Sequence, residues 1–207
     1  YHGYAGKISR INLTRNKVKI HHIEKELITA FLGGRGFNSK TLYHEVPKHV
    51  KPLSPQNRLM FATGPLVGTA FPLGARFNVS AKSPLTGILG DSNAGGHFAA
   101  EMKFAGYDQI IIEGKSPKPA YIFIRDQEIQ IKDADHLVGK DVYETTETIK
   151  KDLGERSVQV ATVGPAAENR VLYSGIFANL ARPAARTGMG TVMASKNLKA
   201  IALKGTS

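Results

Sequence analysis

The sequence has 207 residues, of which 42% are hydrophobic and 22% charged, as in an ordinary globular domain. It contains no cysteine, which excludes disulfide bonds, a cysteine-ligated iron–sulfur cluster and a thiol nucleophile within these residues and fits a cytoplasmic protein. The net charge of +11 favours an anionic partner, such as a phosphate, a nucleic acid, a membrane surface or an acidic subunit. No apolar run approaches the ~20 residues of a membrane span.

The first half of the chain alternates between short strands and short helices. Hydrophobic patterns and turn residues predict strands at 7–13 and 17–20, helices at 24–32 and 38–46, and strands at 58–63, 76–82 and 109–113. Between the last two strands, a Gly-rich loop at 92–96 leads into a helix at 96–105. The GGRG segment at 33–36 is either a helix C-cap with a linker or another loop that contacts anions.

The second half repeats this order. We expect a hairpin at 120–125 and 128–132, a helix at 141–153, strands at 158–162 and 171–177, a helical segment at 188–195 and a strand at 199–203. The sequence therefore predicts an α+β fold made of a duplicated unit, with two mixed β-sheets, a few short helices and a pseudo-two-fold relation. The repeats would cover about 7–115 and 118–205 of a single domain spanning 1–207.

The first candidate site is the Gly-rich loop with the strand before it. A loop of this kind at a helix N-terminus presents free N–H groups and a positive dipole end to an anion. Arg76 adds a forked cation, and Gly95 and Gly96 allow a ligand to approach the backbone closely. In the alternative interpretation, Arg76 is a solvated strand-end residue and Asn93 is a helix N-cap beside flexible glycines.

The second candidate site lies in the cationic loop at 181–190. Arg182 and Arg186 are four residues apart and would face one side if the segment were helical. Two arginines without acidic neighbours repel each other, so a bound anion would stabilise them; the alternative is an ordinary surface pair. The chain shows no paired carboxylates, no metal-ligand spacing of histidines and no nucleophile motif, so we expect a binding platform without catalytic residues.

Several long motifs resemble the N-terminal domain of the tungsten-containing aldehyde:ferredoxin oxidoreductase family. They include GKISRINLTRNKVKI, FLGGRGFN, PLSPQNRLMFATGPLVGT, ARFNVSAKSPLTGILGDSNAGGHFAAEMKFAGYDQIIIEGK, TVGPAAENRVLYSGI and RTGMGTVMASKNLKAIALKG. The resemblance covers nearly the whole chain. It implies a base of two related β-sheet halves that carries two molybdopterin moieties. These moieties share one tungsten or molybdenum, and Mg²⁺ bridges their phosphates.

The resemblance also implies site residues. The family positions that contact the pterins match Arg76, Asn93, Gly95, Arg182, Pro183, Ala185 and Arg186. The backbone carbonyls that hold Mg²⁺ would be those of Asn93 and Pro183. The family commonly has Ala at the position of Pro183 and Gly at that of Ala185. Pro183 keeps its carbonyl but has no N–H, and Ala185 opposes a very close backbone approach.

The implied enzyme oxidises an aldehyde to a carboxylic acid and passes electrons through a [4Fe–4S] cluster to ferredoxin. Later domains of the family carry the cluster cysteines, so we expect this chain to be a fragment or a separate subunit whose partners are the remaining domains, with a homodimer left open. The metal and the substrate are not determined by the sequence. The alternative functions are a basic nucleic-acid-binding module, disfavoured by only 8% aromatic residues, and a cofactor-free scaffold subunit.

Overall fold

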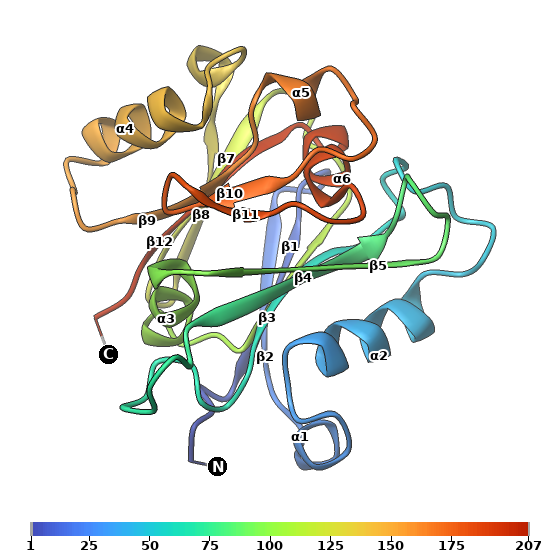
Figure 1. The fold of residues 1–207 in the computed structure, drawn as a ribbon, viewed down its shortest axis with the longest axis vertical. Helices are drawn as coiled ribbons and strands as arrows, with labels where there is room; N and C mark the ends of the chain where they lie inside the picture. Colours follow the sequence, from blue (N-terminus) through green and yellow to red (C-terminus); the bar gives the residue numbers. More distant parts are fainter. Residues whose placement is uncertain (1, 207) are drawn as a thin grey trace.

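The computed structural model describes residues 2–206 and contains, within them, two six-stranded mixed sheets (Figure 1). The strands of the first sheet are β1 (Lys7–Asn12), β2 (Lys17–His22), β3 (Leu59–Thr63), β4 (Arg76–Lys82), β5 (Leu89–Gly95) and β6 (Gln109–Glu113). Those of the second are β7 (Ala120–Arg125), β8 (Glu128–Asp133), β9 (Gln159–Thr162), β10 (Ile176–Ala178), β11 (Arg182–Ala184) and β12 (Leu198–Lys204). The helices are α1 (Lys25–Phe31), α2 (Arg35–Glu45), α3 (His97–Phe104), α4 (Val142–Leu153), α5 (Pro165–Glu168) and α6 (Met189–Ser195), with a 3₁₀ turn at Asp135–Leu137.

The two sheets have the same strand order. The first runs β2-β1-β6-β3-β4-β5 and the second β8-β7-β12-β9-β10-β11. In each sheet, the strands that come first and last in the sequence lie next to each other and are parallel, β1 with β6 and β7 with β12. The other four pairs of each sheet are antiparallel. The predicted α+β fold with two mixed sheets is confirmed. The repeat boundaries at 7–115 and 118–205 and the pseudo-two-fold relation stay predictions.

The main core lies between the sheets and is shared by both halves. Phe61, Phe77 and Phe98 from the first half pack together with ring centroids 5.0–6.1 Å apart. They belong to the same apolar cluster as Ile122 and Ile201 from the second half. Helices α3 and α6 each contact strands of both sheets. Because burial of apolar surface drives folding, this shared core joins the two halves into one unit.

The outer face of each sheet has its own small core. On the first sheet, Phe37 of α2 and Leu27 of α1 pack with Ala62, and Leu42 of α2 packs with Met60. On the second, Ile149 of α4 lies in a separate cluster with strand residues, and Figure 1 shows α4 and α2 on opposite sides of the molecule. Among the described residues, no helix is both long and apolar enough to cross a membrane.

Two sequence-based element predictions were wrong. The predicted strand at 171–177 is a turn followed by the short strand β10, because the short helix α5 and the left-handed Arg170 (φ 61°) redirect the chain, and Ser174 N–H bonds to Val171 O. The predicted loop at 92–96 is mostly strand: β5 runs to Gly95 and pairs with β4 along its whole length. Here strand pairing overrides the weak β-propensity of Gly and Asn.

The GGRG segment at 33–36 divides between two roles. Its glycines 33 and 34 form the junction between α1 and α2, and Arg35 and Gly36 are the first residues of α2. Helix α2 therefore begins three residues earlier than the sequence predicted.

Candidate functional site

The outermost strands of the two sheets, β5 and β11, lie side by side across the middle of the molecule (Figure 1). Each is an edge strand, so one row of its backbone N–H and C=O groups is not paired within its own sheet. Helix α3 begins directly after β5, and α6 begins a few residues after β11. We call this junction the seam, and it comprises Arg76, Asn93, Gly95, Arg182, Pro183, Ala185 and Arg186.

Asn93 and Pro183 occupy matching positions in the two sheets. The corresponding rows of paired residues across three strands are Ala62–Asn78–Asn93 and Thr162–Phe177–Pro183. Gly95 follows Asn93 by two residues, as Ala185 follows Pro183. The structure therefore places the two predicted carbonyl positions at equivalent points of two adjacent edge strands.

The cationic loop does not form a helix. Arg182 and Pro183 belong to β11, so the option in which Arg182 and Arg186 share a helix face was wrong. Arg182 pairs with Ala178 of β10, and Arg186 follows the strand in a bend. Pro183 lacks a backbone N–H, which an edge strand tolerates because its free side needs no partner in the sheet.

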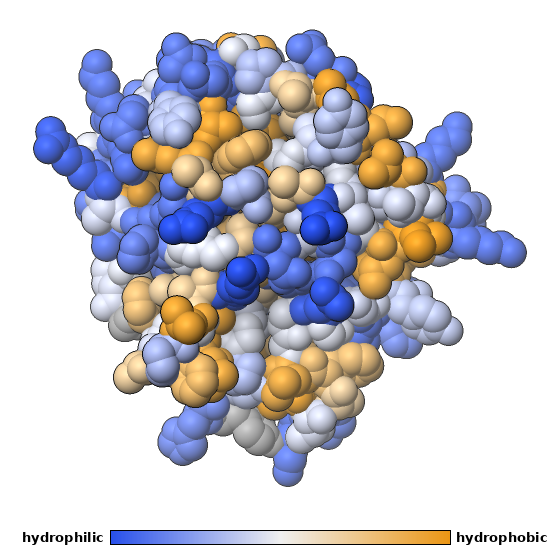
Figure 2. Space-filling model, viewed as in Figure 1, coloured by the Kyte–Doolittle hydropathy of each residue, from blue (hydrophilic) through white to orange (hydrophobic). Residues whose placement is uncertain are grey.

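Three arginines of the seam are exposed: Arg76, Arg182 and Arg186. None of them forms an ion pair with any of residues 2–206. Figure 2 shows strongly hydrophilic side chains gathered at the centre of this face, over β4, β5 and β11. Unneutralised cations at one surface repel each other, so this part of the molecule favours a polyanion.

Direct contacts join the two candidate loops, the one at 92–96 and the cationic one at 181–190. The Arg186 N–H donates to Ser92 Oγ (3.1 Å) across the seam. A Cβ on Gly96 would lie 3.4 Å from Cγ of Arg182 and 2.6 Å from Oδ1 of Asn179. With φ at +103°, Gly96 is required by both its backbone conformation and its neighbours. Gly95 differs, because a Cβ there would meet only Ala75 O at 3.8 Å.

A chain of buried amides supports Asn93 from below. Gln109 Nε2 donates to Asn38 Oδ1 (2.9 Å), Asn38 Nδ2 donates to Asn78 Oδ1 (2.8 Å), and Asn78 Nδ2 donates to Asn93 Oδ1 (3.2 Å). Asp91, two residues before Asn93, pairs with Arg35 at 2.5 Å. Sequence analysis missed these supporting residues because they come from four separate elements and no local motif links them.

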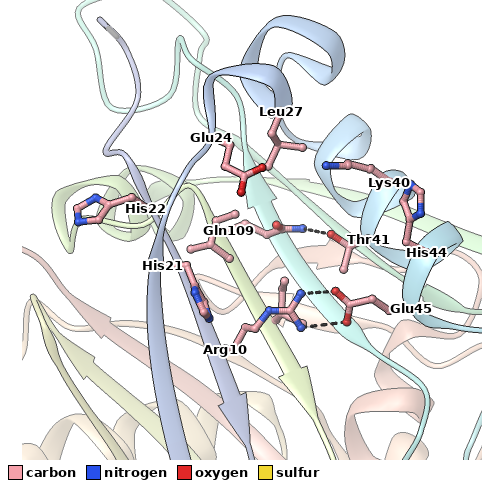
Figure 3. A pocket seen from close by; sticks show the side chains of 12 residues that line it. Arg10, His21, His22, Glu24, Leu27, Lys40, Thr41, His44, Glu45 and Gln109 are labelled. Carbon is pink, nitrogen blue, oxygen red and sulfur yellow. Dashed lines mark hydrogen bonds and ion pairs between the residues drawn. The ribbon is translucent and has the colours of Figure 1, made fainter.

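Apart from the seam, a polar hollow lies on the outer face of the first sheet and contains none of the predicted site residues. It has a volume of about 550 Å³ and lies between β1, β2, α1 and α2, with His21, Lys40 and Gln109 in its lining (Figure 3). Arg10 binds Glu45 in this hollow, and Arg58, which is not part of its lining, also donates to Glu45. Burial alone would raise the pKa of the Glu45 carboxyl, but these hydrogen bonds and charges hold it below its ordinary value. Within residues 2–206, no three His, Cys, Asp or Glu side chains cluster as metal ligands.

Fold and site together define the class, which is a two-sheet α+β domain with exposed arginines where two edge strands meet. The comparison with known proteins gives the family. The chain belongs to the family described as aldehyde ferredoxin oxidoreductase, N-terminal domain, whose model matches residues 8–205. The predicted family is thereby confirmed.

Curated relatives match nearly the whole of this chain. The tungsten-containing aldehyde ferredoxin oxidoreductase of Pyrococcus furiosus is 48% identical over 205 residues, covering 99% of this chain and 34% of the relative. The aliphatic sulfonate oxidoreductase, WOR-like subunit, of the same organism is 34% identical over 220 residues, covering 99% and 35%. The chain thus spans about a third of the length of the curated relatives it matches.

A solved structure has the same domain fold. A chain of the active site complex BamBC of benzoyl coenzyme A reductase, in complex with 1,5-dienoyl-CoA, superposes with a TM-score of 0.97 and 42% identity. The match covers 100% of this chain and 31% of that chain. The fold described above therefore also occurs in a protein whose name refers to a different reaction.

Proposed function

We propose that this chain is the tungstopterin-binding domain of an enzyme that oxidises an aldehyde to a carboxylic acid. Electrons would leave through a [4Fe–4S] cluster held by other domains and pass to ferredoxin. The names of the relatives support this proposal, because four of them are tungsten-containing aldehyde ferredoxin oxidoreductases with 45–48% identity. The structural observation that carries it is the seam, where two adjacent edge strands meet among three arginines that lack acidic partners within residues 2–206.

The residues of the seam fit a ligand with two similar anionic ends. Arg76, Arg182 and Arg186 would neutralise phosphate charge, and guanidinium groups can grip phosphate with two parallel hydrogen bonds. The open space in front of Gly95 leaves its backbone accessible to a ligand. Neither a positive φ nor a protein neighbour requires glycine at this position, so a close ligand is the physical reason that we propose for it.

The matching register of Asn93 and Pro183 supports a shared Mg²⁺ site. Each would contribute a backbone carbonyl, and carbonyl oxygens are suitable ligands for this hard cation. Pro183 loses nothing for this role, because only its N–H is missing. Ala185 is exposed and carries a methyl group where the family commonly has none, so we expect contact at its side chain rather than a close backbone approach.

The domain would contribute position and charge rather than reacting groups. When bound, the tungsten centre supplies the two-electron oxidation. The arginines of this chain would hold the pterin phosphates, and the amide chain behind Asn93 would fix the strand that faces them. The relatives keep this domain while their names refer to aldehydes, aliphatic sulfonates and glyceraldehyde 3-phosphate, so we propose that other domains choose the substrate.

The test replaces the cations of the seam in the protein at its natural length. We expect Arg76→Ala and Arg182→Ala to lower the tungsten and pterin content per chain at least several-fold, because each removes a charge-assisted contact. The matched control is Arg15→Ala, an exposed arginine in the turn between β1 and β2. Metal content by mass spectrometry and pterin content by fluorescence measure the result. Full loading of both seam variants would contradict the proposal.

A further inference from the structure

Each half of the molecule sends a hairpin turn across the seam to the start of a helix in the other half. Asn179 lies directly after β10, and its Oδ1 accepts a hydrogen bond from the Phe98 N–H of α3 (3.1 Å). Ser83 lies directly after β4, and its Oγ donates to the Thr187 carbonyl just before α6 (2.8 Å). The two contacts run in opposite directions between the halves.

Neither helix caps its own N-terminus. The N-cap of α3 is Gly96 and that of α6 is Gly188, and neither offers a side-chain acceptor. At both glycines, the hairpin turn from the opposite half packs where a side chain would lie. A Cβ on Gly96 would lie 2.6 Å from Oδ1 of Asn179. One on Gly188 would lie 2.9 Å from Cγ of Pro84 in the hairpin and 2.0 Å from Leu172 O in its own half.

The orientation of Asn179 is itself fixed. Its backbone is left-handed, with φ at 48°, a conformation that Asn tolerates better than most residues. Its Nδ2 donates to Oε1 of Gln159 on β9, so the amide oxygen is directed at α3. The helix start is thus held from the second half, beside the Arg182 side chain that also comes from the second half.

On the basis of the proposed function, we infer that Asn179 and Ser83 are a reciprocal pair of positioning residues for the cofactor. Asn179 holds the Gly95–Gly96 corner against Arg182, and Ser83 holds Thr187 next to Arg186. Neither residue needs to touch the ligand. Because each corner is anchored in the opposite half, loss of one tie separates the two corners and weakens the grip on both ends of the ligand.

The test uses Asn179→Gly in the protein at its natural length. Glycine keeps the left-handed backbone without strain and removes only the side chain. The matched control is Asn197→Gly, because Asn197 is also left-handed (φ 55°) and its Nδ2 donates to Ser116 O (2.7 Å) beyond the other end of α6. Asn179→Gly should give roughly five-fold faster hydrogen exchange at the Phe98 amide and a several-fold lower tungsten content, and Asn197→Gly neither.

The second arm uses Ser83→Ala, with Ser54→Ala as its control, since Ser54 Oγ also donates to a backbone carbonyl (2.8 Å) but in an exposed turn. Ser83→Ala should lower the tungsten content, and Ser54→Ala should not.

Unchanged Phe98 exchange in Asn179→Gly would overturn the inference, and so would faster exchange with full tungsten loading. Should Asn179→Gly not fold, Asn179→Asp keeps an acceptor oxygen but loses the Nδ2 donor to Gln159, and faster Phe98 exchange with full tungsten loading in that variant would also overturn the inference.

If the proposed function is wrong, the variants give a different set of results than if only the positioning inference is wrong. In that case Arg182→Ala retains full tungsten loading, whereas the exchange of Phe98 still reports whether Asn179 caps α3. The positioning inference alone fails when Arg182→Ala loses tungsten but Asn179→Gly does not.

Discussion

Gly95 and Gly96 are adjacent in sequence but differ in the reason for being glycine. Gly96 has φ at +103° and no room for a Cβ beside Asn179, so the fold itself requires glycine. Gly95 has neither constraint, and its front side is open. Sequence analysis could mark both as candidate site residues but could not separate these roles, because the contact with Asn179 comes from 83 positions further along the chain than Gly96.

Alanine substitutions should separate the two roles. Gly96→Ala should lower the free energy of unfolding by about 1–3 kcal/mol, because it combines backbone strain with a steric clash. Gly95→Ala should change it by no more than about 0.5 kcal/mol but should lower the tungsten content, since its methyl group projects toward the proposed ligand. Chemical denaturation and metal analysis measure the two effects. Equal destabilisation by both substitutions would show that Gly95 is also required by the fold.

Single elements show which features a sequence reveals. The strands predicted at 76–82, 109–113 and 120–125 coincide with β4, β6 and β7. Runs of apolar residues identify β6 and β7, whereas β4 alternates apolar and polar residues, as a strand does. The errors at 92–96 and 171–177 have the same cause, because in both segments the neighbouring elements and not the local sequence determine the conformation. Ser, Asn and Gly in β5 form a strand only because β4 and the seam provide partners, and Val171–Tyr173 turn away only because α5 precedes them.

Lys196 connects helix α6 to loops of the first half, a link that the sequence did not reveal. It follows α6 in the second half and is completely buried. Its Nζ donates to three carbonyls of the first half, Asn57 O (2.6 Å), Gly114 O (3.0 Å) and Pro55 O (3.3 Å). Burial, reinforced by the charge of Arg58, lowers the pKa of Lys196 to about 7. The side chain thus links the halves at a cost in desolvation.

Lys196→Met should destabilise the protein by about 2–4 kcal/mol, because three buried carbonyls lose their donor. The exposed Lys151→Met is the control. Since the pKa of Lys196 is lower in the folded state than in the unfolded state, the unfolded chain binds more protons between pH 7 and about 10. Wild-type stability relative to Lys196→Met should therefore rise over that pH range in denaturation experiments. A difference that stays constant with pH would contradict the lowered pKa.

At the scale of the whole molecule, a duplicated sheet order brings two edge strands together. The duplication could be predicted, because the order of elements repeats along the sequence. The equivalence of Asn93 and Pro183 could not, because it depends on the pairing register of three strands in each sheet. Likewise, net charge indicated an anionic partner, but only the fold shows that Arg76, Arg182 and Arg186 lie at one junction.

The most direct test of the central claim is the position of tungsten in a crystal of the loaded protein at its natural length. An anomalous difference map at a tungsten absorption edge locates the metal without reference to the protein sequence. We predict a single tungsten peak over the seam between β5 and β11, with Asn93 and Pro183 on either side of the bound group. A peak elsewhere, such as over the hollow lined by His21 and Lys40, would contradict the account.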